Sequence, residues 1–223
     1  MRNLFGLIIS FLFIGIVILS AKIFEKAGKE ASRKYVHIVL SNWWIIAMVF
    51  FDNPFVAAIG PAVFVVVNFL SYKFNLIKSI ERDEGERDGL GTVYYALTLF
   101  ILAVLMFGPL KNYSSKIWGP TIGLVGVAVM GYADALASII GRSVKSPSYT
   151  ISTSTKTLAG SGAMLATTFI IASGFLAYSN IPLWYFKALM IALVDTVFEA
   201  VSIKGTDNLT VPLATVFMIL LMI

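Results

Sequence analysis

Residues that could bind a phosphorylated ligand are concentrated between Gly131 and Met164. Asp134 falls within an apolar segment, where an ionisable side chain is costly and normally faces the protein interior or a water-filled cavity. Arg142 follows about two helical turns later, and Lys156 precedes the next apolar segment. A carboxylate that can hold Mg²⁺, with cations that can hold phosphates, suits a metal-bound polyphosphate. The alternative is an Asp134 buried against a lysine or arginine for packing.

Lys156, Gly160 and Ser161 lie at the predicted start of a helix. The free N–H groups and dipole of a helix N-terminus attract anions, and glycine permits close approach to the backbone. The pattern is not a P-loop, because Thr155 rather than a glycine precedes Lys156. We expect all three residues to bind phosphate, although Lys156 alone is also typical of a lysine at the end of a membrane span.

A second acidic group lies near the end of the chain. Glu199 comes four residues after Asp195, hence on the same face of a helix. Two such acids repel unless a metal, a proton or cations from other helices stabilise them. We expect Glu199 to bind a metal together with Asp134, and Asp207 and Asn208 to reach the metal or a ribose. For Asp195, a hydrogen-bonded contact between helices is an equally good interpretation.

Basic residues supply further candidates for binding phosphate. Arg33, Lys34 and His37 open the second apolar segment, and His37 could also move a proton. Arg87 is the cation nearest the membrane in the charged segment 81–95. The alternative for the first group is a snorkelling cation beside an interfacial histidine.

The composition indicates an integral membrane protein. Hydrophobic residues make up 58% of the 223 positions and charged residues 13%, a composition outside the range of soluble domains. A helix needs about 20 apolar residues to cross a bilayer, which predicts a single all-α domain, 1–223, with seven or eight spans. We expect the first span to be retained, since it is too long for a signal peptide. The eight candidate spans are roughly 3–21, 36–51, 54–72, 91–108, 117–140, 158–178, 183–202 and 209–223.

The distribution of charge predicts the orientation. With eight spans, thirteen of the seventeen lysines and arginines fall in loops on one side, which the positive-inside rule assigns to the cytosol. Both termini are then outside, and all the polar clusters converge on the cytosolic face. The net charge of +5 is spread over short loops, so we expect no nucleic-acid partner. The absence of cysteine excludes thiolate catalysis, and a single histidine argues against a histidine-based metal site.

Four motifs taken together resemble one known family. RKYVHI, GLGTVYY, GYADALASIIGR…KTLAGSGAM and Glu199 followed by GTDNLTVPL occur in this order along the chain. They are similar to the motifs of the phytol kinase, dolichol kinase and CTP-dependent diacylglycerol kinase family, which is distantly related to the phosphatidate cytidylyltransferases.

The resemblance implies transfer of the γ-phosphate of CTP to the hydroxyl of a membrane lipid alcohol. By that resemblance Asp134 holds Mg²⁺, Arg142 and Lys156 clamp phosphates, and Glu199, with Asp207 and Asn208, completes the site. The acceptor stays open among phytol, geranylgeraniol, a polyprenol and diacylglycerol, as does the oligomeric state. The alternatives are synthesis of a CDP-lipid by a cytidylyltransferase, whose usual signature is absent, and a small transporter, whose usual internal repeat is also absent.

Overall fold

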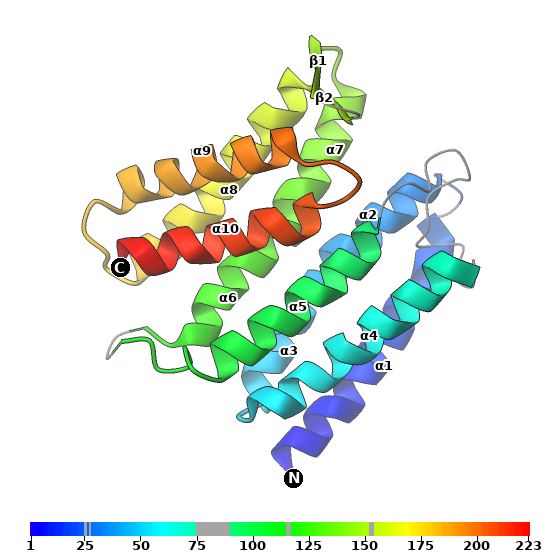
Figure 1. Ribbon diagram of the computed structural model, residues 1–223, viewed down its shortest axis with the longest axis vertical. Helices are drawn as coiled ribbons and strands as arrows, with labels where there is room; N and C mark the ends of the chain where they lie inside the picture. Colours follow the sequence, from blue (N-terminus) through cyan, green and yellow to red (C-terminus); the bar gives the residue numbers. More distant parts are fainter. Residues whose placement is uncertain (25, 27, 75–89, 115–116, 152–153) are drawn as a thin grey trace.

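The computed structural model describes residues 1–24, 26, 28–74, 90–114, 117–151 and 154–223. Nearly all of these residues are helical (Figure 1). The first half contains α1 (Arg2–Phe24), α2 (Lys29–Ser41), α3 (Trp43–Phe50), α4 (Pro54–Phe74) and α5 (Gly91–Phe107). The second half contains α6 (Gly119–Ala128), the π-helix η4 (Val129–Ala133), α7 (Asp134–Ser143), α8 (Leu158–Tyr178), α9 (Trp184–Val201) and α10 (Asp207–Met222).

The predicted all-α architecture is confirmed, with one small addition. Each of the eight apolar segments corresponds to one helix or to consecutive helices, as in α2 with α3 and in α6, η4 and α7. The addition is an antiparallel hairpin, β1 (Ser148–Ile151) with β2 (Ser154–Thr157), between the predicted spans 117–140 and 158–178. Tyr149 pairs with Lys156 in its register. The hairpin therefore holds Lys156 in a fixed strand instead of a free loop.

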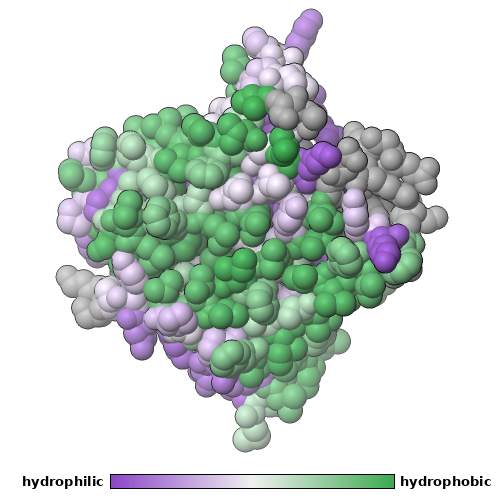
Figure 2. All heavy atoms as spheres, in the orientation of Figure 1, coloured by the Kyte–Doolittle hydropathy of each residue, from purple (hydrophilic) through white to green (hydrophobic). Residues whose placement is uncertain are grey.

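Several helices are built to cross a membrane. Among the described residues, α1, α4, the continuous helix Gly119–Ser143 and α8 are long and apolar enough to do so, and α5 and α10 are shorter apolar helices. Figure 2 shows hydrophobic side chains over most of the face drawn, with hydrophilic ones at its margins. The chain is thus an integral membrane protein by length and composition of its helices. The number of spans and the outer position of the termini stay predictions.

Glycines let α6 approach its neighbours closely. A Cβ atom on Gly123 would lie 2.4 Å from the Trp44 ring, and one on Gly126 would lie 2.7 Å from Val216. Trp44 is fully buried at the centre of the core, and its indole N–H donates to the carbonyl of Pro120 at 2.8 Å. Small residues in α6 therefore serve helix packing against α3 and α10.

The polar ends of distant segments meet at one end of the bundle. In Figure 1, α2, α7 and the connection between α9 and α10 lie near one another in the upper half of the molecule. Contacts join α2 to η4 and α7, α7 to β2, and α10 to η4. The contacts of η4 with α2 and with α10 join segments that are more than 70 residues apart in the chain.

Candidate functional site

Asp134 and Lys34 form a buried ion pair. The Nζ atom of Lys34 donates to Oδ2 of Asp134 at 2.6 Å, and Nδ1 of His37 lies 3.9 Å from the same oxygen. The side chains of Lys34 and His37 are 5% and 3% exposed, and that of Asp134 is 13% exposed. Arg33 is also buried and close enough to act electrostatically on Asp134. Three cationic or titratable groups of α2 therefore face one carboxylate.

The backbone just before Asp134 forms a π-helix that packs closely against α2. The π-helix η4 ends at Ala133, immediately before Asp134, and single π-turns of this kind are frequent at functional sites. A Cβ atom on Gly131 would lie 2.4 Å from the Cβ and Oγ atoms of Ser41. Gly131 therefore allows α2 to pack directly on η4. The predicted span 117–140 is therefore helical but not α-helical throughout, since it contains this π-turn.

Tyr95 fixes His37 from the other side. Its hydroxyl donates to the backbone carbonyl of His37 at 2.9 Å, and the two ring centroids are 4.7 Å apart. Tyr95 is buried in α5. Its motif, GLGTVYY, stands out in the sequence, but the contact of Tyr95 with His37, 58 positions away, could be found only from the structure.

Lys156 forms a second cluster of charges. Its Nζ atom lies 2.5 Å from Oε1 of Glu199 and 3.6 Å from Oδ2 of Asp207. Burial disfavours the charged form of Lys156, but the charges of Asp207 and Glu199 outweigh this effect and hold the pKa of Lys156 above its ordinary value. Lys156 therefore carries its charge throughout the physiological pH range.

The two clusters form one electrostatic site. The charge of Asp134 acts on both Lys156 and Glu199. Within the described part of the chain, Oε2 of Glu199 and Oδ1 of Asn208 are buried and have no hydrogen-bond partner. The site thus holds two lysines, three carboxylates and two oxygen atoms whose hydrogen-bonding capacity is unused.

The start of α8 is held by packing and capping. The Thr157 hydroxyl accepts from the Gly160 N–H at 3.2 Å and donates to the carbonyl of Gly141 at 3.3 Å. A Cβ atom on Gly160 would lie 2.9 Å from the carbonyl oxygen of Ala137. The hydroxyl of Ser161 bonds that of Tyr149 at 2.6 Å. These contacts explain Gly160 and Ser161 without a ligand, so phosphate binding by these two residues stays a prediction.

The remaining predicted residues are not part of the ion pairs that Lys34 and Lys156 form. Arg142 is exposed in the last turn of α7, and Arg87 lies outside the described residues.

Asp195 is fully buried and accepts a hydrogen bond from the Thr215 hydroxyl at 2.6 Å, so it joins α9 to α10. Asn208 is buried, and its amide donates to the carbonyl of Gly205 at 3.3 Å. The interpretation of Asp195 as a helix contact is the one that this geometry favours.

The oxygen atoms of the site could supply some, but not all, of the ligands of a Mg²⁺ ion. No three Asp, Glu, His or Cys side chains among the described residues converge on one point. Mg²⁺, however, is usually held by one or two carboxylates, with substrate phosphates and water completing the shell. Asp134 and Glu199 supply two carboxylates, and the unused Oε2 of Glu199 is an available donor.

A bundle of membrane-type helices with lysine and carboxylate clusters at one end is an arrangement suited to binding a phosphorylated ligand at a membrane. The chain is 27% identical to the phytol kinase of Synechocystis sp. over 91% of its own length and 85% of that protein. It is 30% identical to the probable chloroplastic phytol kinase of Triticum aestivum, covering 68% of it, and 32% identical to the chloroplastic phytol kinase 1 of Arabidopsis thaliana, covering 65%. The chain belongs to the phytol kinase family. No family model and no solved structure matches it.

Proposed function

We propose that this protein transfers the γ-phosphate of CTP to the hydroxyl of phytol or a closely related isoprenoid alcohol at the cytosolic membrane face. The observation that carries the proposal is the pair of neighbouring clusters, Lys34 with Asp134 and Lys156 with Glu199 and Asp207. The names of the relatives support phytol as the acceptor. The use of CTP follows from the family resemblance.

In this reaction the oxygen of the alcohol bonds to the γ-phosphorus as the bond from that phosphorus to the bridging oxygen breaks. The products are the lipid phosphate and CDP, and the hydroxyl proton passes to a base. Phosphoryl transfer depends chiefly on positioning and on stabilising the negative charge of the transferring oxygens. The site therefore needs cations, an aligned acceptor and one proton acceptor.

Lys34 and Lys156 supply the cations. Each is paired with a carboxylate, and phosphate oxygens replace part of these contacts when the triphosphate binds. Arg33 and Arg142 add positive charge on either side, and Asp207 and Asn208 contact the ribose. Because Lys156 stays charged, it needs no proton change to bind phosphate.

Asp134 and Glu199 would hold Mg²⁺ in the complex with nucleotide, and the ion would supply positive charge to the phosphate oxygens. His37, whose Nδ1 atom lies 3.9 Å from Oδ2 of Asp134, receives the proton of the acceptor hydroxyl, since a ring nitrogen of neutral imidazole can accept a proton. Tyr95 positions His37 through its backbone carbonyl.

The test is a phosphotransfer assay on purified protein in detergent with Mg²⁺. Labelled CTP and ATP are each combined with phytol, geranylgeraniol, a polyprenol, diacylglycerol and phosphatidic acid. CDP together with phytyl phosphate supports the proposal. Pyrophosphate together with a CDP-lipid assigns the protein to the cytidylyltransferases instead, and no turnover of either nucleotide overturns the proposal.

A further inference from the structure

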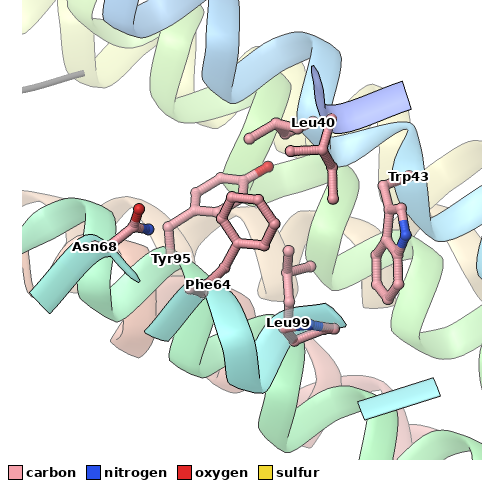
Figure 3. A pocket seen from close by; sticks show the side chains of 9 residues that line it. Leu40, Trp43, Phe64, Asn68, Tyr95 and Leu99 are labelled. Atoms are coloured by element: carbon pink, nitrogen blue, oxygen red, sulfur yellow. The ribbon is translucent and has the colours of Figure 1, made fainter. Parts of the chain in front are cut away.

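Two adjoining hollows open between α1, α2, α3, α4 and α5. They share four lining residues, Leu40, Phe64, Asn68 and Tyr95, and therefore form one groove. Figure 3 shows the first hollow, with Asn68 and Trp43 on opposite sides of Phe64 and Tyr95.

The lining changes from polar to apolar along the groove. Arg33, His37 and Thr92 line only the second hollow, whereas Trp43, Pro61 and Leu99 line only the first. A helix rises about 1.5 Å per residue. The rise along α5 from Thr92 to Leu99 is therefore about 10 Å, and the rise along α2 and α3 from Arg33 to Trp43 is about 15 Å. The groove therefore reaches roughly halfway through a hydrocarbon core of about 30 Å.

The polar end of the groove opens at the site described above. His37 lines it, and its Nδ1 atom lies 3.9 Å from Oδ2 of Asp134. Tyr95 contributes its ring to both hollows while its hydroxyl holds the His37 backbone. A molecule with one hydroxyl on a long apolar chain matches both ends of this groove, because the hydroxyl meets the charged site and the chain meets Trp43 and Leu99.

The groove also borders the lipid phase. Leu12, Ile16 and Leu19 of α1, and Val63 and Val66 of α4, are exposed apolar residues on the two helices that flank it. These side chains face the bilayer in a membrane-embedded bundle. An acceptor can then enter sideways from the membrane with its chain remaining in apolar surroundings.

We propose that this groove holds the hydroxyl-proximal part of the hydrocarbon chain of the lipid alcohol, with the hydroxyl beside His37 and Asp134 and the chain passing Trp43 and Leu99. The inference rests on the proposed function for the nature of the acceptor. It adds that Phe64 and Leu99 determine which chain lengths are accepted. A single chain fills the groove, so diacylglycerol, with two chains, is a poor acceptor.

Leu99→Trp tests the apolar end, since a larger ring there blocks the far part of the groove. We expect kcat/KM for the twenty-carbon alcohol phytol to fall at least tenfold, the effect of a misfit of about one methylene group or more. Activity on a ten-carbon isoprenoid alcohol and the KM for CTP should be unchanged. Phe69→Trp is the matched control, because Phe69 is 48% exposed on α4 and does not line the groove. An equal loss for both alcohols, or no loss, overturns the groove while leaving the proposed kinase activity intact.

If Leu99→Trp fails to fold, the groove can be tested with a second variant, Phe64→Ala, and with a labelling experiment. Phe64→Ala widens the groove and should shift preference towards longer polyprenols. A twenty-carbon alcohol with a photoreactive group at the middle of its chain should label wild-type peptides containing Trp43 or Leu99, as read by mass spectrometry. This readout needs no turnover, so it separates failure of the groove from failure of the proposed function. Labelling spread evenly over exposed apolar residues such as Phe69 would refute the inference.

Discussion

At the scale of single residues, the site combines two lysines with carboxylates that come from other helices. Lys34 pairs with Asp134, 100 positions away, and Lys156 with Glu199, 43 positions away. Such buried pairs contribute little net stability, but removing one partner leaves the other charge without compensation. Loss of activity and loss of stability must therefore be separated in any test of these residues.

Lys156→Met is expected to abolish phosphotransfer, because the transferring phosphate loses a cation. It should also destabilise the fold by about 3 kcal/mol, since Glu199 loses its partner. The double variant Lys156→Met, Glu199→Gln should recover most of the stability and none of the activity. Thermal unfolding in detergent and the phosphotransfer assay measure the two effects. Lys187→Met is the control, because Lys187 bonds the Met222 carbonyl near the C-terminal end of α10.

If Lys156→Met keeps near-normal activity, Lys156 is no part of the site. If the double variant recovers activity together with stability, the lysine has only a structural role. The same comparison applies to Asp134→Ala, which we expect to abolish turnover while the protein stays folded in detergent.

Asp195 and Glu199 are one helical turn apart, and the structure separates their roles. Asp195→Asn should retain at least half of the activity, because an amide oxygen still accepts from the Thr215 hydroxyl. Glu199→Gln should lose activity by about 100-fold or more, the range typical of a lost charged group at a reacting centre. Steady-state rates of the two variants at saturating CTP measure these two losses of activity. Equal losses in both would mean that Asp195 belongs to the chemistry.

At the scale of elements, the contact between α2 and η4 sets the distance from Lys34 to Asp134. Gly131→Ala adds a methyl group that meets Ser41 at 2.4 Å, so α2 must move outwards. Overpacking of this kind costs about 1–3 kcal/mol. We expect activity to fall at least tenfold, since both Lys34 and His37 move with α2, and thermal unfolding to shift only moderately.

Gly162→Ala is the matched control for this prediction. Nothing lies within 4 Å of a Cβ atom at Gly162 in α8, so this change should leave activity unaltered and slightly favour the helix. An equal effect of the two substitutions would contradict the proposed importance of the α2–η4 contact.

At the scale of the whole molecule, the absence of cysteine makes the predicted orientation directly measurable. Lys145→Cys introduces a thiol between α7 and β1, and Tyr178→Cys introduces one at the opposite end of α8, where Tyr178 is 88% exposed. In sealed vesicles, an impermeant maleimide should label position 145 from the cytosolic side and position 178 from the outer side. Labelling of both from one side would contradict the span between them, and reversed labelling would contradict the orientation.

The amino-acid sequence determined the helices and most of the candidate residues. Membrane helices are specified by local runs of about 20 apolar residues, so every predicted span matched a helix or a continuous set of helices. Ionisable residues near apolar segments stand out for the same reason, and on that ground alone Asp134, Lys156 and Glu199 are candidate site residues.

Only the tertiary structure decided which of these residues meet. The Lys34–Asp134 pair, the position of His37 under Tyr95 and the groove behind it each depend on packing between helices far apart in the chain. The π-turn of η4 and the β1–β2 hairpin likewise went unpredicted. Hydrophobic periodicity reports which side of a helix is buried but not what it is buried against, because that choice is made by the side chains of other segments.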